Sequence, residues 1–267
     1  MKGIPRIAAA RAASQPLPMP GKLSHKLIPA QIVRWARFQG HLRGCRDFTR
    51  ADLEATFDRI CGEIDLERIN NLRNRMRLIH EADPAAPVKF LDLNYWLRLN
   101  ICRAVKLKLH LQTGLRILDL GSGAGYFVAV CRHFGHAPLG IDMPRDLWRP
   151  SERAIYEELL AALSCETTEL LIQSFEPLRI DGRFDLITGY LVCFNNHKLP
   201  DEWSRPQWEF FVGDALTHLN RCGALILELN THRERYGRLK WFDRETLKYF
   251  RSVGSLTEKG NVLVINK

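Results

Sequence analysis

The chain has 267 residues, 46% of them hydrophobic and 26% charged, with a formal net charge of +9 at pH 7. This composition predicts a globular protein with one sizeable core, or a core domain with an appendage. No apolar run approaches the roughly 20 residues of a membrane-spanning helix, and the start of the chain does not resemble a secretory signal. Seven cysteines without a C-x-x-C pair predict free thiols in a reducing, cytoplasmic setting, and no zinc or iron–sulfur site.

The positive charge is concentrated at the start of the chain. Residues 1–46 hold nine of the 39 Lys and Arg residues and no acid, so the remainder is neutral by count. Residues 1–24, rich in Ala and Pro, predict a basic flexible leader, although an organelle transit peptide has a similar composition. The basic segment could bind RNA or an anionic membrane, or simply be solvated.

Residues 25–89 predict a helical N-terminal cap. A helix over 29–43 would place Ile32, Trp35 and Phe38 on one face, which could pack on the core or lie on a membrane. Thr49 and Asp52 indicate an N-terminal cap and begin a second helix. A third helix is predicted over 66–80, and a fourth over about 90–109.

From residue 116 onward, strands and helices alternate, which predicts an α/β fold with a mostly parallel sheet. The predicted strands are 116–120, 137–142, 168–173, 184–190 and 223–229, followed by a hairpin over 254–258 and 261–266. The predicted helices are 126–134, 151–163, 206–219 and 242–250. Residues 90–267 therefore form the predicted main domain.

A glycine-rich stretch after the first strand indicates a ligand site. Gly121, Gly123 and Gly125 permit a sharp turn and close approach of a ligand, and the following helix would point free N–H groups at it. Asp142 ends the second strand about twenty residues later, where an acid accepts hydrogen bonds from ribose hydroxyls. Asp119 precedes the glycines, and its carboxylate would repel the diphosphate of a nicotinamide dinucleotide while attracting a cation.

Together, the D-x-G-x-G-x-G pattern of residues 119–125 and Asp142 resemble the class I S-adenosylmethionine-dependent methyltransferases. The resemblance covers roughly residues 90–267. It implies a Rossmann-like, seven-stranded, mostly parallel sheet of order 3-2-1-4-5-7-6, with the seventh strand antiparallel. It also implies S-adenosylmethionine as the cofactor.

The resemblance assigns site residues by position. Asp119 would hold the methionine ammonium, and Asp142 the ribose hydroxyls. The remaining cofactor-binding residues implied are Gly121, Ser122, Gly123, Met143, Gln173, Ser174, Phe175 and Tyr190. The stretch 173–175 departs from the family, in which many members have an acid there; Gln173 could pair with the adenine edge and Phe175 could stack on the ring.

The acceptor side is predicted where strand four ends. His197 is the candidate general base, with Tyr190 a second catalytic candidate near the transferred methyl group. Asn195 and Asn196 are candidates for orienting the acceptor, and Tyr95 for a pocket wall. Residues 195–197 could instead form a polar turn. A metal-assisted mechanism is not expected, because strand four ends without an acid.

The predicted function is methyl transfer from S-adenosylmethionine to an oxygen or nitrogen of a small molecule. Two alternatives stay open: an RNA or protein methyltransferase that uses the basic arm, and a catalytically silent S-adenosylmethionine-binding domain that serves as an interaction module. Nucleic acid is not the favoured partner, because the motif of enzymes that methylate base amino groups is absent after strand four. The oligomeric state is not predicted.

Overall fold

The structure is a computed structural model that describes residues 47–192, 203–229, 232–233, 239–240, 242–257 and 261–267. Within these ranges, no helix is long and apolar enough to cross a membrane. The leader 1–24 and the helix predicted over 29–43 lie outside them.

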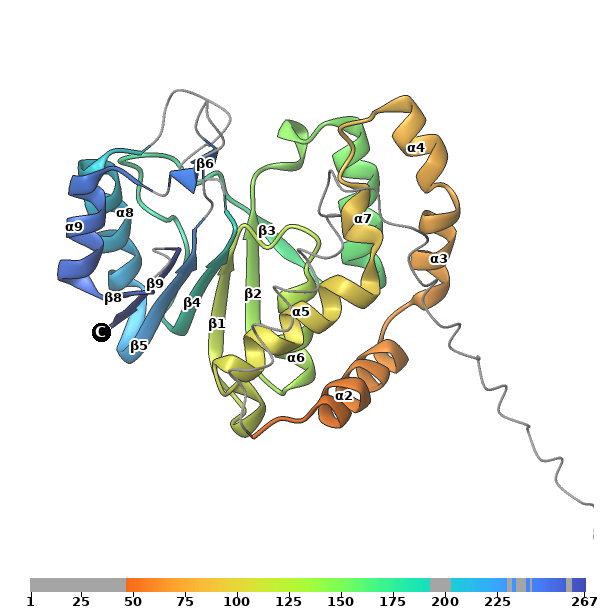
Figure 1. Ribbon diagram of the computed structural model, residues 1–267, viewed down its shortest axis with the longest axis horizontal. Coiled ribbons are helices and arrows are strands. Elements are labelled where there is room, and N and C mark those ends of the chain that lie inside the picture. The colour runs from red at the N-terminus through yellow and green to blue at the C-terminus, as the bar shows by residue number, and fades with distance from the viewer. Residues whose placement is uncertain (1–46, 193–202, 230–231, 234–238, 241, 258–260) are drawn as a thin grey trace, which may run out of the picture.

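A seven-stranded sheet forms the centre of the fold (Figure 1), with the order β3-β2-β1-β4-β5-β9-β8. The strands are β1 (Arg116–Leu120), β2 (Ala137–Asp142), β3 (Thr167–Glu169), β4 (Phe184–Tyr190), β5 (Leu219–Glu228), β8 (Ser255–Leu256) and β9 (Val262–Asn266). The first five are parallel, whereas β9 runs antiparallel to β5 and β8. The predicted order 3-2-1-4-5-7-6 with an antiparallel seventh strand is confirmed.

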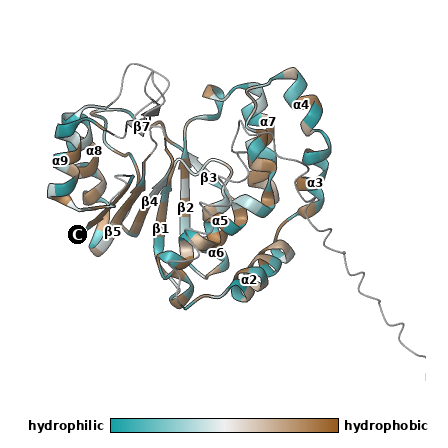
Figure 2. Ribbon diagram, viewed as in Figure 1, coloured by the Kyte–Doolittle hydropathy of each residue, from teal (hydrophilic) through white to brown (hydrophobic). Residues whose placement is uncertain are grey.

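Helices cover both faces of the sheet, and the side chains of β1 explain why. Ile117 joins the hydrophobic cluster of α5 (Leu93–Lys106), α6 (Tyr126–His133) and α7 (Pro150–Ala162). Leu118 and Leu120 join the cluster of α8 (Arg205–Thr217) and α9 (Arg244–Val253) on the opposite face. A strand that is apolar on both faces must be central in a three-layer fold, and the central strands are largely hydrophobic in Figure 2.

In the described part of the chain, α5 is preceded by α2 (Arg50–Glu63), α3 (Leu66–Asn74) and α4 (Met76–Ala82). The predicted cap of α2 is confirmed, since Thr49 and Asp52 form a capping box. The single helix predicted over 66–80 is wrong. The helical hydrogen-bond pattern is interrupted at Arg75, whose N–H donates to the carbonyl of Leu72 in a tightened last turn of α3, and α4 begins at Met76.

Several boundaries differ from the predicted ones. α5 begins later than predicted, because the Asp92 side chain caps it by accepting from the N–H of Tyr95. Short 3-10 turns flank it at η1 (Val88–Leu91) and η2 (Leu109–Leu111), and a third, η3 (Arg145–Leu147), follows β2. β3 is shorter and β5 begins earlier than predicted. After β5, a small two-stranded sheet is formed by β6 (His232–Arg233) and β7 (Leu239–Lys240).

Candidate cofactor site

The glycine loop lies between β1 and α6, at the edge where the parallel strands end. Gly121, Gly123 and Gly125 have φ angles of +64°, +53° and +78°, the left-handed region that favours glycine. A Cβ at Gly121 would also lie 2.9 Å from Val192, and one at Gly125 would lie 2.8 Å from Leu160. The loop therefore needs glycine for its backbone angles and, at two positions, for space.

Asp142, the last residue of β2, holds this loop in place. One carboxylate oxygen accepts from the N–H of Gly123 at 2.5 Å, and the other accepts from the N–H of Met143 at 2.8 Å. The N–H of Ser122 donates to the carbonyl of Ile141 at 2.9 Å. Burial raises the pKa of Asp142, although the two hydrogen bonds oppose that rise. Each carboxylate oxygen has a further lone pair, so the group can still accept from ligand hydroxyls.

Asp119 lies beside the loop on β1 and is only 3% exposed. The hydroxyl of Thr188 donates to its Oδ1 at 2.8 Å, and no other hydrogen bond reaches this carboxylate from the described part of the chain. Burial raises the pKa of Asp119 to about 7, and the Thr188 hydrogen bond and the charge of Arg103 act in the opposite direction. A buried carboxylate with a spare oxygen is suited to bind a ligand cation.

A buried ion pair completes this edge and was missed by the sequence reasoning. Arg103 of α5 donates from Nη2 to Oε2 of Glu228, at the end of β5, at 2.7 Å. The guanidinium carbon of Arg103 lies 4.2 Å from the centre of the Tyr190 ring. The sequence contains a signal for this pair: Arg103 follows the apolar Leu99 by four residues, so the two side chains share a face of α5, and that face is buried.

Tyr190 ends β4 next to this pair. Its ring packs edge-on against Phe127 of α6, with ring centroids 4.8 Å apart. Burial raises the pKa of its phenol above the ordinary range, so the hydroxyl stays protonated at neutral pH. Tyr190 is therefore a neutral donor rather than a base.

The predicted adenine-side residues follow β2 and β3 at the same sheet edge. Met143 is 41% exposed, and Gln173 is exposed. Phe175 adopts a φ of +60°, is 56% exposed and contacts Phe210 of α8, with ring centroids 5.9 Å apart. Ser174 is partly buried beside it. Phe175, the residue predicted to stack on the adenine, therefore packs against α8 in this structure.

Two other predicted residues have packing roles in the chain itself. The Ser122 hydroxyl is buried over β2, where a Cβ at Gly140 would lie 2.8 Å from it, and no described group hydrogen-bonds to it. Tyr95 is partly buried on the first turn of α5, and its ring meets that of Trp96 edge-on. Asn195, Asn196 and His197 lie outside the described residues, so their roles stay predictions.

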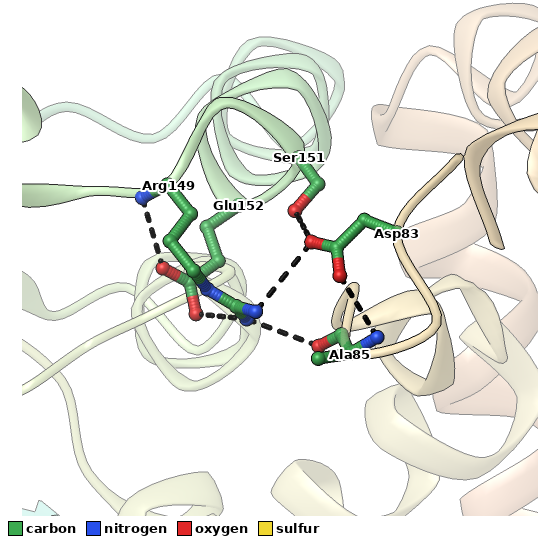
Figure 3. Close-up of polar contacts among 5 residues, drawn as sticks. All are labelled: Asp83, Ala85, Arg149, Ser151 and Glu152. Atoms are coloured by element: carbon green, nitrogen blue, oxygen red, sulfur yellow. Dashed lines mark hydrogen bonds and ion pairs between the residues drawn. The ribbon is translucent and has the colours of Figure 1, made fainter.

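Hydrogen bonds join the chain segment 83–90, which precedes α5, to the start of α7 (Figure 3). Asp83 accepts from the Ser151 hydroxyl and from the N–H of Ala85. Arg149 donates to the carbonyl of Ala85 at 3.0 Å and to Glu152 at 2.7 Å. These contacts anchor the segment to the helix that follows β2.

The other end of segment 83–90, at Phe90, is hydrogen-bonded to α6. The Tyr126 hydroxyl donates to the carbonyl of Phe90 at 2.6 Å. Because Tyr126 is the first residue of α6, the segment spans the first turns of the two helices that follow β1 and β2. It thus fixes the helices that flank Asp119 and Asp142.

A separate hollow of about 650 Å³ lies between α3, α4 and α7. Its rim is charged, with Arg68, Arg75 and Glu157, and its floor includes Leu72 and Leu160. Neither Asp119 nor Asp142 lines it, so it is not part of the candidate cofactor site.

The sheet order, with its antiparallel seventh strand, is that of the class I S-adenosylmethionine-dependent methyltransferase fold. No protein-family model and no curated protein matches the sequence.

Solved methyltransferase structures resemble the chain. An amino pentose methyltransferase from Micromonospora echinaspora, solved with S-adenosylmethionine bound, is 15% identical over 64% of this chain and 91% of its own, with a TM-score of 0.44. DesVI from Streptomyces venezuelae is 10% identical over the same shares, 64% and 91%, with a TM-score of 0.43. A Clostridium acetobutylicum S-adenosylmethionine-dependent methyltransferase is 19% identical over 60% and 58%, with a TM-score of 0.37.

Proposed function

We propose that this protein binds S-adenosylmethionine at the ends of β1 and β2 and transfers its methyl group to an oxygen or nitrogen of a small molecule. The observation that carries the proposal is a pair of carboxylates, the buried Asp119 and the partly buried Asp142, on either side of a left-handed glycine loop. The chemistry of the two acids fits this cofactor, since one can take an ammonium and the other two ribose hydroxyls.

The same pair argues against a nicotinamide dinucleotide. Such a cofactor places its diphosphate over the glycine loop. Asp119 lies at that loop in a buried setting, where repulsion between like charges is stronger than in water. S-adenosylmethionine places its cationic end there instead.

The residues of this chain would bind and orient rather than react. Asp119 would hold the ammonium, and Asp142 the ribose. Met143, Gln173 and Phe175 would contact the adenine. The bound cofactor supplies an already activated methyl group, so the protein's main contribution is alignment of the acceptor.

The acceptor side would be built around Tyr190, with Tyr95, Asn195 and Asn196 as positioning groups. His197 would accept a proton if the acceptor is a hydroxyl or a protonated amine. In this proposal Tyr190 positions the acceptor and does not take the proton, since burial keeps its phenol neutral.

The test is transfer of an isotope-labelled methyl group into a fractionated small-molecule extract, followed by mass spectrometry. The proposal predicts at least one labelled small molecule with the native protein and none with Asp119→Asn. Label found only in RNA or protein would contradict the small-molecule acceptor. Cofactor binding with no labelled product in any fraction would favour a silent binding domain.

A further inference from the structure

The buried pair of Arg103 and Glu228 lies next to the proposed cofactor site and has no part in the function proposed so far. Both side chains are only 5% exposed. Burying two charges is unfavourable unless their pairing is good, and such pairs seldom add stability over apolar residues of similar size. Stability alone therefore does not explain the pair, and its position indicates a role in ligand binding.

The pair joins α5 to the ends of two strands. Glu228 is the register partner of Tyr190, and its carbonyl accepts from the N–H of Leu191 at 2.7 Å. Arg103 is positioned from its own helix by Asn100, whose Oδ1 accepts from Nη1 at 3.1 Å. The positive charge of Arg103 also acts on the proposed cofactor site, where it lowers the pKa of Asp119.

The charge of the ligand makes this arrangement important. S-adenosylmethionine carries an ammonium, a carboxylate and a sulfonium, and so has a net charge of +1. The demethylated product, S-adenosylhomocysteine, has lost the sulfonium charge and is neutral overall. An arginine without a counter-charge in a buried site would repel the first ligand more than the second.

We propose that Glu228 is a specificity-determining residue whose carboxylate neutralises Arg103, so that the site retains its affinity for the sulfonium form relative to the neutral product. The inference rests on the proposed binding of S-adenosylmethionine. It concerns the ratio of two affinities rather than either one. Any effect of Arg103 on Asp119 acts on the ammonium that both ligands share, and so cancels in that ratio.

The test compares the two dissociation constants by calorimetry in Glu228→Gln and Glu228→Asp. The first variant keeps the shape and removes the charge, whereas the second keeps the charge and changes the shape. For Glu228→Gln, binding of S-adenosylmethionine should weaken by about tenfold and binding of the product by less than about threefold. For Glu228→Asp, the ratio should stay within about twofold of the native value.

A double variant separates charge from packing. Arg103→Gln combined with Glu228→Gln removes both charges and should return the ratio to near the native value, although the native ion pair is still missing. If Glu228→Gln does not fold, Arg103→Gln alone decides, since loss of the positive charge must then shift the ratio in favour of S-adenosylmethionine, and an unchanged ratio would count against the inference.

Three results would overturn the inference: equal losses for both ligands in Glu228→Gln, no recovery in the double variant, or a loss specific to S-adenosylmethionine in Arg103→Gln. Failure of the native protein to bind either ligand would refute the proposed function instead. Native binding of both ligands with an unchanged ratio in Glu228→Gln would refute only the inference.

Discussion

Binding of S-adenosylmethionine should weaken in acid because Asp119 loses its charge. Burial raises the pKa of this carboxyl to about 7, so it changes charge near neutral pH. The charged groups that act on it are Arg103 from α5 and Asp142 from β2. The protonated carboxyl cannot pair with an ammonium, and the protein must release that proton to bind the ligand.

The size of the effect follows from the fraction of the protein that is competent to bind. With a pKa of about 7 for Asp119 and about 7.8 for the ligand ammonium, the association constant should fall about sixfold between about pH 7.4 and pH 6. The fall should reach about seventeenfold by about pH 5.5. Binding should also weaken above about pH 8, where the ligand loses its own charge.

Calorimetry in buffers of different ionisation enthalpy measures both the affinity and the proton released. Thr188→Val is the matched variant, because the Thr188 hydroxyl lowers the pKa of Asp119. Its acid limb should move to higher pH. Affinity that stays constant between about pH 5.5 and 7.4, or an acid limb that Thr188→Val leaves in place, would refute the reasoning.

Three further predictions concern the same loop and its two acids. Asp119→Asn should raise the free energy of unfolding in urea by about 2–4 kcal/mol at about pH 8 and change it little at about pH 4. The reason is that the pKa of Asp119 is raised in the folded protein, so the native protein loses stability as pH rises through about 7. Equal effects at both pH values would contradict this. Asp142→Ala should weaken S-adenosylmethionine binding by at least about tenfold in calorimetry, since the acceptor of the Gly123 and Met143 N–H groups is lost. Met143→Ala, which changes a neighbouring side chain that is 41% exposed, should weaken binding less. Gly121→Ala should destabilise the protein by about 1–3 kcal/mol in urea unfolding, more than Gly123→Ala, because a Cβ at Gly121 would lie 2.9 Å from Val192, whereas the nearest atom to a Cβ at Gly123 is 4.0 Å away. Equal losses in the two variants would show that crowding at Val192 does not matter.

The central strands of the main sheet were predictable because their signals are local and strong. Ile117, Leu118 and Leu120 form an apolar run that suits only a strand buried on both faces. The glycines and the two acids have fixed spacing, and the structure brings Asp142 onto the loop. The order of the strands and the antiparallel direction of the seventh came from the family resemblance rather than from periodicity.

The break at Arg75 was less predictable, because apolar spacing continues through it. Local backbone geometry at one residue decided the outcome, and hydrophobic periodicity does not report it. The shortening of β3 has a similar origin. Residues 170–173 read as strand-like, yet only Thr167–Glu169 pair with β2.

The ion pair between Arg103 and Glu228 depends on tertiary structure, since 125 residues separate the partners. The sequence suggests only that Arg103 lies on a buried face of its helix. Its partner could be named only after the sheet order had brought the end of β5 beside the end of β4. The acceptor residues pose the same difficulty, because spacing along the chain does not determine what they contact.

Calorimetric titration of the native protein with S-adenosylmethionine and, separately, with NAD tests the central claim most directly. Saturable binding of S-adenosylmethionine, weakened in Asp119→Asn, together with no heat from NAD, is the predicted result. Binding of NAD, or no binding of S-adenosylmethionine by protein that unfolds cooperatively, would contradict the assignment of the glycine loop.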